Sequence, residues 1–424
     1  MKRRNLVQGL GVVAAAGSLG WLGGCASVSG KGPKVVVVGG GYGGATAAKY
    51  VRMWSDHGID VTLVEPQANF VSCPISNLVL GGSKTLADIT LSHDALVRRH
   101  GVRLVRDRVE RIDSGQRKVV LAGGAELPYD RLILSPGIDF MWDKLPGMNQ
   151  PGMQEQVLHA WKAGPQTAAL RRQLEAMPDG GVFALSIPLA PYRCPPGPYE
   201  RACQVAHYFK QAKPRSKVII LDANDDVTSK PALFKKAWAE RYAGLIEYRP
   251  KHELSDVDGR TLRFDFADDL KADVLNVIPP MRAGAIAVKT GLATANSRWC
   301  DVDFLTFESK AAPHIHVLGD AIQIAPMMPK SAHMANQHGK TCAAAVVALL
   351  TGREPNPLPI YNNTCYSFVS DEDVVHVASV HRYDAAQKTM LPVPGSGGVS
   401  AAANELEGRY AMAWARNIWA DTLS

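Results

Sequence analysis

Residues 34–50, KVVVVGGGYGGATAAKY, carry the strongest local signal in the chain. Four consecutive valines, 35–38, predict a fully buried strand, and the small residues after the glycines predict the start of a helix. Gly39, Gly41 and Gly44 have the spacing G-x-G-x-x-G. The first permits a tight turn, the second lets the backbone approach a pyrophosphate, and the third lets helix and strand pack closely. This segment therefore predicts a dinucleotide-binding domain.

Two acidic strand ends extend this nucleotide site. The run IDVTLVEP predicts a second strand that ends at Glu65, whose carboxylate can accept both hydroxyl hydrogen bonds of a ribose. Much later, KAAPHIHVLGDA predicts another apolar strand, followed by Gly319 and Asp320. An aspartate at this position can hold a sugar-alcohol chain and can also cap the next helix. A nucleotide fold that closes so far from its start is the split organisation of a flavoprotein, which predicts FAD as the cofactor.

A second α/β unit is inserted between these halves. The runs GGVFALSIP, SKVIILDAN and ADVLNVIPP predict its buried strands. Its first turn, PLAPYRCPPGPYE, has no glycine triplet; proline lacks an N–H, and side chains there block close approach of the backbone. We therefore expect no NAD(P) in this domain, and we interpret Asp222 as a cap or turn residue rather than a ribose acceptor.

The predicted fold class is α/β with two Rossmann-like, dinucleotide-binding-type domains. Residues 31–150 and 299–355 form the FAD-binding domain in this prediction, and residues 151–298 form the inserted domain. The run RVERIDSGQRKVVLAGGAELPYDRLILSPG predicts a β-meander and a strand that returns to the nucleotide. Residues 356–424, with a strand in YNNTCYSFV and a helix in RYAMAWARNIWADTL, predict a C-terminal α+β domain that covers the flavin and supplies an interface.

Residues 1–30 predict an export signal. A charged start with paired arginines precedes GLGVVAAAGSLGWLGG, which is too short and too weakly apolar for a spanning helix. The paired arginines resemble a twin-arginine signal, which exports proteins already folded around a cofactor, and they predict a periplasmic location. Residues 22–25 also resemble a lipobox, at which Cys25 would be lipidated and tether the protein to a membrane; ordinary cleavage nearby is the alternative.

Composition narrows the function classes. The 424 residues are 46% hydrophobic and 21% charged, as in ordinary globular proteins, and this length suits two or three domains. The net charge is +7, and no block of lysine and arginine alternates with aromatic residues, so we expect no nucleic-acid partner. The chain contains no CxxCH haem attachment motif, and we predict no metal site.

Two distant cysteines are expected to meet. Cys194 lies in the glycine-free turn of the inserted domain, which faces the cleft between the nucleotide-type domains, and Cys365 lies in the unit that covers the flavin ring. A disulfide between them beside a flavin would relay electrons. The short-spaced redox pair of thiol–disulfide reductases is missing, because Cys73 in FVSCPISN stands alone; it either lines the flavin pocket or is a small buried thiol. The other cysteines of the body are interpreted as buried structural thiols: Cys203, Cys300 and Cys342.

Several motifs together resemble one family. VVVVGGGYGGATAAKY, RCPPGPYERA, NVIPPMRAG, VLGDA, MPKSAHMANQHGK and NTCYSF look like the flavoprotein subunit of flavocytochrome c sulfide dehydrogenase, over nearly the whole chain from about residue 34. The resemblance implies a periplasmic FAD protein of the glutathione-reductase type. It implies that sulfide is oxidised at a Cys194–Cys365 pair and that electrons pass singly to a c-type cytochrome subunit. We expect the FAD to be non-covalent. Proline after Cys73 and the lipobox depart from the pattern of the family.

Four further residues complete the predicted site. Glu200, on the first turn of the helix after Cys194, either accepts a proton from sulfide or persulfide or is simply favoured by the helix dipole. Trp414 either packs in the core or forms a wall or electron path at the flavin. Lys330 is predicted to place positive charge near the flavin pyrimidine edge, and His333 to be a neutral structural donor.

Two other functions stay open. One is a sulfide:quinone reductase, which would need a lipid-facing apolar surface. The C-terminal helix, which is mildly amphipathic, is too polar on its other face to supply one. An exported flavin-binding accessory factor that repairs the disulfides of partner proteins belongs to a different class and would not turn sulfide over.

Overall fold

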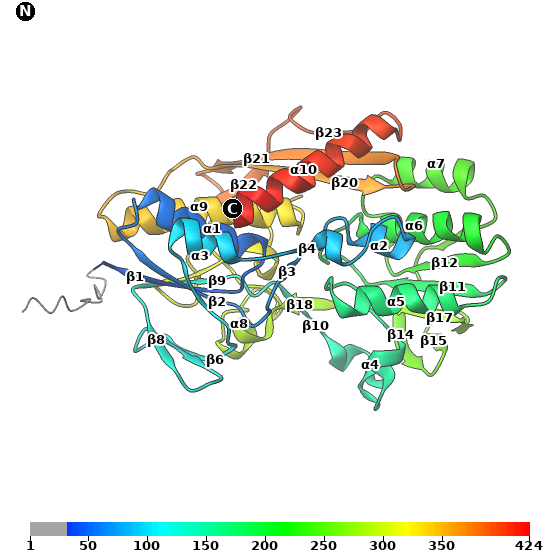
Figure 1. The fold of residues 1–424 in the computed structure, drawn as a ribbon, viewed down its shortest axis with the longest axis horizontal. Helices are drawn as coiled ribbons and strands as arrows, with labels where there is room; N and C mark the ends of the chain where they lie inside the picture. The colour runs from blue at the N-terminus through cyan, green and yellow to red at the C-terminus, as the bar shows by residue number, and fades with distance from the viewer. Residues whose placement is uncertain (1–31) are drawn as a thin grey trace, which may run out of the picture. The chain divides into compact units, whose positions relative to one another are not determined.

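The computed structural model describes residues 32–424, so the predicted export signal and Cys25 lie outside the described residues. A five-stranded parallel sheet follows the order β19-β9-β1-β2-β5. Its strands are β1 (Lys34–Val38), β2 (Asp60–Val64), β5 (Arg103–Val105), β9 (Arg131–Leu134) and β19 (Ile315–Val317). Figure 1 shows β1, β2 and β9 of this sheet. Because β19 comes from late in the chain and lies beside β9, the sheet is assembled from two distant segments.

Helices α1 (Tyr42–Trp54) and α9 (Ala332–Leu350) pack closely against each other beside this sheet. The closeness depends on glycine, because a Cβ built on Gly339 would lie 2.6 Å from the carbonyl oxygen of Gly43. The valines of β1 are buried on both faces of the sheet, as their run predicted. The short helix α3 (Asp94–His100) also contacts α1.

The predicted meander is present as an antiparallel three-stranded sheet. It consists of β6 (Val109–Asp113), β7 (Lys118–Leu121) and β8 (Glu126–Pro128). It leads directly into β9, the strand predicted to return to the nucleotide. Smaller elements follow β2 in the chain or lie before and after β19: β3 (Phe70–Val71), β4 (Thr90–Leu91), α8 (Ala285–Lys289) and the short 3-10 turn η4 (Gly319–Ala321). Helix α2 (Ser76–Gly81) instead packs against two helices of the second part, α5 (Pro165–Ala176) and α6 (Gly197–Ala212).

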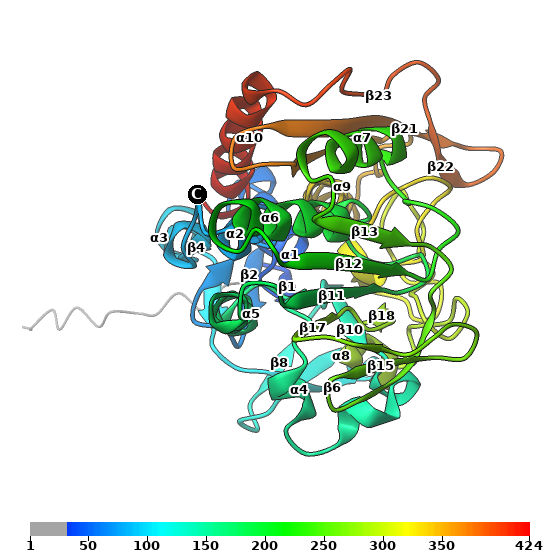
Figure 2. The same cartoon turned by 90° about the vertical axis from the view of Figure 1, so that its right-hand side faces the viewer.

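A second parallel sheet has the order β13-β12-β11-β17 (Figure 2). Its strands are β11 (Val182–Ile187), β12 (Lys217–Asp222), β13 (Ile246–Arg249) and β17 (Val274–Val277). The helices of this part are α4 (Met153–Gln156), α5 (Pro165–Ala176), α6 (Gly197–Ala212) and α7 (Pro231–Arg241). A small antiparallel excursion consists of β14 (Leu254–Asp258), β15 (Thr261–Phe264) and β16 (Leu270–Lys271). The two parallel sheets confirm the predicted fold class.

A two-stranded ribbon marks the passage between the two sheets. Strand β10 (Ile138–Phe140) precedes the second sheet, β18 (Met281–Ala283) follows it, and the two pair antiparallel. Both crossings lie near the predicted boundaries of the inserted domain, which remain predictions.

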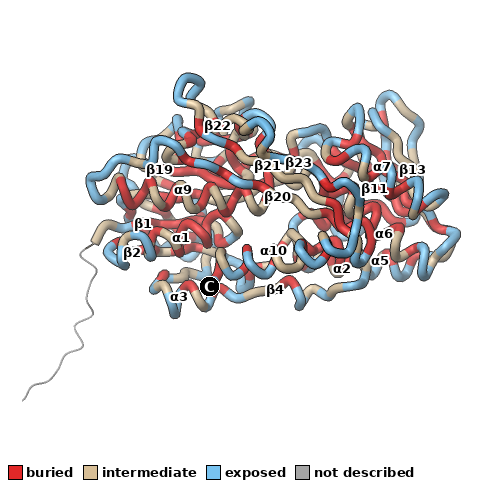
Figure 3. The backbone as a smooth tube through the Cα atoms, turned by 90° about the horizontal axis from the view of Figure 1, so that it is seen from above, coloured by how far each residue is buried: buried red, intermediate tan, exposed pale blue. Residues whose placement is uncertain are grey.

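The C-terminal segment contains a long hairpin and a helix. Strands β20 (Ile360–Phe368) and β21 (Val374–Asp384) pair along their length, with β22 (Thr389–Pro392) and β23 (Gly398–Val399) beside β21. Strand β20 contacts α9 of the first part and α6 of the second, and helix α10 (Glu405–Leu423) packs on α1 and β21. The buried residues follow the two sheets and their helices (Figure 3). No helix within residues 32–424 is long and apolar enough to cross a membrane.

Candidate active site

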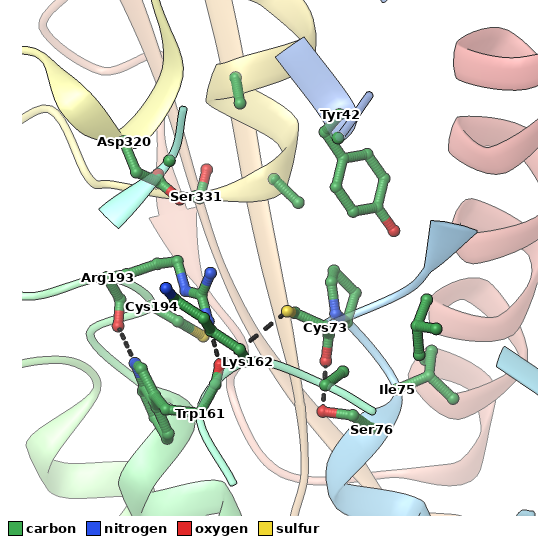
Figure 4. A pocket seen from close by; sticks show the side chains of 18 of the residues that line it. Tyr42, Cys73, Ile75, Ser76, Trp161, Lys162, Arg193, Cys194, Asp320 and Ser331 are labelled. Atoms are coloured by element: carbon green, nitrogen blue, oxygen red, sulfur yellow. Dashed lines mark hydrogen bonds between the residues drawn. The ribbon is translucent and has the colours of Figure 1, made fainter. Parts of the chain in front are cut away.

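A cavity of about 660 Å³ lies where the carboxyl ends of the strands, β20 and α10 converge. Its lining joins the glycine turn after β1 to the turn before α6 and to the middle of β20. Figure 4 shows one part of it, with Cys73, Arg193 and Cys194 in view. The predicted nucleotide turn and the predicted cysteine pair therefore share one cavity.

The three fingerprint glycines each have a distinct structural reason. Gly39 has a φ of +96°, a conformation that side chains disfavour. A Cβ on Gly44 would lie 1.9 Å from the carbonyl oxygen of Gly39, so only glycine lets α1 start this close to β1. A Cβ on Gly41 would meet nothing within 4 Å, and Gly41 lines the cavity. The first N–H groups of α1 are thus open to an anionic group approaching Gly41.

Glu65 lies at the end of β2 and lines the cavity. Its Oε2 accepts a hydrogen bond from the N–H of Gly40 at 2.6 Å, and its Oε1 accepts one from the N–H of Gln67 at 2.8 Å. These bonds fix the carboxylate, and the remaining lone pairs of both oxygens can accept hydrogen bonds from ribose hydroxyls.

Gly319 and Asp320 lie in η4 and line the same cavity. Among the residues described, Oδ1 of Asp320 is buried without a hydrogen-bond partner, and burial raises the pKa of this carboxyl. The alternative cap role is not seen, because Ser331 caps α9 with its side chain. An unpartnered buried acceptor is costly unless a ligand donor meets it. The orphaned Asp320 oxygen and the open Gly41 position therefore fit the sugar-alcohol and pyrophosphate parts of FAD.

Cys194 lies in the turn between β11 and α6 in the left-handed conformation, with a φ of +59°. Its N–H donates to the carbonyl of Lys330 at 2.8 Å, and its own carbonyl accepts from the N–H of Gly197 at 2.9 Å. A Cβ on Gly197 would lie 2.8 Å from Sγ of Cys194, so glycine there leaves room for the sulfur. The backbone on both sides thus holds this sulfur toward the cavity.

Cys365 lies on β20 and lines the same cavity, as predicted from the two elements. Nδ2 of Asn363 lies 3.4 Å from its Sγ. Burial raises the thiol pKa of both Cys194 and Cys365. All six cysteines of residues 32–424 are unbonded in this structure, so the Cys194–Cys365 disulfide is not formed here and stays a prediction.

Glu200 faces the cavity from the first turn of α6. Its Oε1 accepts from the N–H of Phe368 at 2.9 Å, and its Oε2 accepts from Nδ2 of Asn77 at 2.8 Å. Burial raises the pKa of this carboxyl, and neighbouring hydrogen bonds oppose that shift. The structure therefore leaves both roles for Glu200 available: it lies at a helix start, and it faces the cavity that holds the sulfurs.

That Lys330 places positive charge near the flavin pyrimidine edge stays a prediction. Its side chain is buried but does not line the cavity; Nζ donates to the carbonyls of Asp320 and Ile322 at 2.9 and 2.6 Å and lies 3.6 Å from the ring centre of Trp299. Carbonyl acceptors and an aromatic face hold Nζ in place, and burial lowers the pKa of Lys330 to about 7. What Lys330 gives the site is its backbone carbonyl, which holds Cys194.

Trp414 and His333 lie side by side at the cavity, where the C-terminal helix was predicted to cover the flavin. Trp414 of α10 lines the cavity half-buried, with its ring 5.8 Å from that of His333. His333 accepts a hydrogen bond at Nδ1 from the N–H of Thr364, so the proton of the neutral ring lies on Nε2, and the donor role of that nitrogen stays a prediction. Burial lowers the pKa of His333 to about 4, so its ring is neutral at ordinary pH.

The other cysteines divide into two groups. Cys73 lines the cavity, whereas Cys203, Cys300 and Cys342 are fully buried, as predicted for structural thiols. The predicted turn role of Asp222 is also seen. It accepts from the N–H of Asn224 at 3.0 Å and from the hydroxyls of Tyr199 and Tyr248 at 2.7 and 3.1 Å.

Three polar residues of the site were missed from the sequence. Arg201 is buried, and its guanidinium donates to Asn77, to Asn276 and to the carbonyls of residues 159 and 160. Asn77 in turn donates to Glu200. Lys230 donates to the carbonyl of Cys365 at 3.0 Å. Arg201 and Asn77 stand inside motifs quoted above, RCPPGPYERA and FVSCPISN, so a signal was present without its geometry.

Fold and cavity together define a flavoprotein of the two-nucleotide-domain disulfide oxidoreductase class. Residues 33–180 match the family described as pyridine nucleotide-disulphide oxidoreductase. Residues 167–279 match the sulfide dehydrogenase [flavocytochrome c] flavoprotein chain, central, and residues 357–423 match flavocytochrome c sulphide dehydrogenase, flavin-binding.

Individual relatives agree with this. The chain is 63% identical over 46 residues, 11% of its length, to a sulfide dehydrogenase [flavocytochrome c] flavoprotein chain of Chlorobaculum thiosulfatiphilum, of which the match covers 94%. It is 26% identical over 321 residues to the mitochondrial sulfide:quinone oxidoreductase of Mus musculus, covering 72% of this chain and 69% of that one. Its fold matches the sulfide:quinone oxidoreductase of Aquifex aeolicus with a TM-score of 0.75 at 17% identity, over 92% and 91% of the two chains.

The chain therefore belongs to the flavocytochrome c sulfide dehydrogenase flavoprotein family, whose members are FAD-dependent, sulfide-oxidising flavoproteins. FAD is its cofactor, and the glycine turn, Glu65 and Asp320 are the residues that fit it.

Proposed function

We propose that this protein oxidises sulfide to sulfane sulfur at a Cys194–Cys365 pair and passes the electrons to a c-type cytochrome. The observation that carries the proposal is the shared cavity: residues fitted to FAD line it together with both cysteines and Glu200. A redox pair must lie against the flavin to exchange electrons with it, and the lining of this one cavity supports that arrangement.

The chemistry balances at the two sulfurs. Hydrosulfide attacks one sulfur of the disulfide; the S–S bond breaks, one cysteine carries a persulfide, and the other is released as a thiolate. When the disulfide re-forms, sulfane sulfur, one proton and two electrons leave the pair. Bound FAD would accept these two electrons and release them one at a time, as a haem acceptor requires.

Glu200 is the proposed proton acceptor. Its carboxylate lines the cavity beside the pair, and hydrogen bonds from Phe368 and Asn77 hold both of its oxygens. Because burial raises the pKa of Glu200, the carboxylate is a stronger base than an exposed one and can accept the proton of hydrosulfide or of the persulfide.

The location and partners follow as proposals from the sequence. The twin-arginine-like start supports export to the periplasm with FAD already bound, followed either by lipidation at Cys25 or by ordinary cleavage nearby. The name of the Chlorobaculum relative supports a cytochrome partner. The hydrogen bonds from Tyr199 and Tyr248 into Asp222 support a second domain that binds no NAD(P).

A quinone is the second candidate acceptor. It is favoured because the relative from Mus musculus that matches over 321 residues is named a sulfide:quinone oxidoreductase. The two acceptors differ in one measurement, which is whether the reduced flavin is reoxidised by a c-type cytochrome or by a short-chain quinone.

The direct test is anaerobic addition of sulfide to the FAD-loaded protein while the flavin absorbance is followed. We expect rapid bleaching in the wild type and no bleaching in Cys194→Ser or Cys365→Ser, each of which should keep its FAD. Cys342→Ser, a change at a fully buried cysteine outside the cavity, is the matched control and should bleach normally. An intact wild type that does not bleach, or that acts only on protein disulfides, would refute the proposal and favour the accessory factor.

A further inference from the structure

Lys230 is a buried lysine behind the cysteine pair that the proposed mechanism does not use. It is 5% exposed, and its backbone has a φ of +54° at the start of α7. Residues other than glycine, asparagine and aspartate seldom adopt this left-handed backbone conformation, and those that do are concentrated at functional sites. Among the ion pairs of residues 32–424, none includes Lys230.

The ammonium of Lys230 is bound to the strand that carries Cys365. Nζ donates to the carbonyl of Cys365 at 3.0 Å and to Oγ of Ser367 at 2.8 Å, with a longer contact of 3.4 Å to the carbonyl of Val375. Residues two apart on a strand share a face, so the side chains of Asn363, Cys365 and Ser367 lie on one face of β20. The bond to Ser367 therefore places the positive charge on the same face as the sulfur of Cys365.

All of these acceptors are neutral, so the charge of Lys230 lacks a bonded counter-ion. A buried charge is costly unless an opposite charge compensates it. The titratable groups around Lys230 and Cys365 come from the surrounding elements: Cys194 in the turn before α6, Glu200 on α6, His333 on α9, His376 on β21 and Glu407 on α10. Of the two sulfurs, the one on β20 lies on the strand that Lys230 binds.

Cys194 has a different electrostatic environment. The charged neighbours that act most strongly on its thiol are Cys365 and Glu200, which both disfavour a thiolate there. Arg193 opposes them, but its guanidinium is bonded to the carbonyl of Trp161. At Cys365, burial is again the largest influence and raises the thiol pKa, but the next largest is Lys230, which lowers it.

We propose that Lys230 is a positioning residue that holds Cys365 of the reduced pair as its thiolate in preference to Cys194. The inference rests on the proposed function only in taking these two cysteines as the redox pair. The step is a proton loss from the Cys365 thiol to solvent or Glu200, with the lysine ammonium compensating the charge that is left. Burial lowers the pKa of Lys230 to about 8, and a Cys365 thiolate opposes that shift, so the two charges stabilise each other. A thiolate is both the nucleophile and the better leaving group in thiol–disulfide exchange, so Lys230 would govern how readily the Cys365 sulfur breaks and re-forms the S–S bond.

The test measures each thiol directly and needs no sulfide. The FAD-loaded protein is reduced with a phosphine and alkylated with iodoacetamide over a series of pH values. Peptide mapping then gives a separate labelling midpoint for Cys194 and for Cys365. In the wild type we expect the midpoint of Cys365 to lie below that of Cys194. In Lys230→Met we expect the Cys365 midpoint to rise by about one to three pH units, with labelling below the midpoint at least about tenfold slower and Cys194 little changed.

Lys49→Met is the matched control. Lys49 is also a buried lysine whose Nζ donates to backbone carbonyls, those of Ala420 and Asp421, but it contacts α10 and not β20. This variant should lose comparable packing and leave both midpoints unchanged. If Lys230→Met does not fold, Ser367→Ala, which removes one acceptor of the ammonium, should give a smaller rise of the Cys365 midpoint.

Two results would overturn the proposal. One is a wild-type protein in which Cys194 is labelled at the lower pH. The other is a folded Lys230→Met or Ser367→Ala protein with an unchanged Cys365 midpoint. Loss of sulfide oxidation with the expected midpoints would instead contradict the proposed function alone, because alkylation reports only on the thiols.

Discussion

Alanine at Gly41 and at Gly44 should separate cofactor binding from folding within one turn. The two glycines are three residues apart in the same fingerprint. A Cβ on Gly44 would lie 1.9 Å from the carbonyl oxygen of Gly39, whereas a Cβ on Gly41 would meet nothing within 4 Å. The same added methyl group thus meets backbone in one case and the open cavity in the other.

For Gly44→Ala, the contact cannot be relieved by a side-chain rotation, because the opposing atom is a backbone oxygen. Helix α1 must move away from β1, whose four valines are buried. Overpacking of a close-packed interior costs about 1–3 kcal/mol, and a backbone contact this short should cost at least the upper value. We expect the free energy of unfolding of the apoprotein to fall by about 3 kcal/mol, with FAD binding lost as a consequence.

For Gly41→Ala, the backbone conformation poses no obstacle. Its φ of −74° is open to any residue, so the apoprotein should be as stable as the wild type or about 0.4–1 kcal/mol more stable, because alanine has fewer unfolded conformations. The methyl group, however, occupies the approach to the first N–H groups of α1. Loss of one hydrogen bond to a charged phosphate costs about 1.5–3 kcal/mol, which weakens FAD binding by about tenfold to a hundredfold.

Two measurements decide the outcome. Urea unfolding of the apoproteins gives the stability of each variant, and titration with FAD, followed by quenching of flavin fluorescence, gives the affinity. Gly41→Ala with wild-type affinity would refute the placement of the pyrophosphate at this turn. Gly44→Ala with wild-type stability would refute the close approach of α1 to β1.

Three further changes test the electrostatics. Burial raises the pKa of Glu200, so the folded state holds that proton more tightly and the free energy of unfolding falls as pH rises above 4.5. Glu200→Gln should remove this part of the fall, measured by urea unfolding, and should slow sulfide-driven flavin reduction by about 10²–10⁴-fold. Burial lowers the pKa of Lys330 from 10.5 to about 7, so the unfolded state binds more protons between these values and stability rises with pH there; a Lys330→Met protein that keeps this rise would contradict the buried position of the ammonium. Tyr199→Phe removes a 2.7 Å hydrogen bond to Asp222 and should lower the unfolding free energy by about 1–3 kcal/mol, whereas an unchanged urea midpoint would show that the bond contributes nothing.

The parts of the site that local chemistry determines could be predicted from the sequence. The valine strand, the glycine turn and the acidic strand ends each depend on a few neighbouring residues, and the structure has them where the pattern placed them. The meeting of Cys194 and Cys365 at one cavity followed from topology, because the turns of such sheets and the covering strands converge at the same edge.

The buried polar network could not be predicted in the same way. The direction of the Lys330 side chain depends on Trp299, about thirty positions earlier in the chain, and on carbonyls turned inward by η4. Arg201 contacts Asn77 and Asn276, which lie far from it in the sequence on either side. A buried charge is allowed only where such partners converge, and a single sequence carries no signal of that convergence. Lys230 belongs to the same class.

The turn before α6 explains why a cysteine stands where a phosphate-binding glycine would be expected. A phosphate site needs free backbone N–H groups, and residues 194–198 offer none. The prolines at 195, 196 and 198 have no N–H, and the N–H groups of Cys194 and Gly197 are bonded to protein carbonyls. The bonds that remove these donors also hold the Cys194 sulfur over Gly197, whose missing side chain makes the space for it. The geometry that would exclude a nucleotide from this domain is therefore the same geometry that positions its sulfur, and restoring one should disturb the other.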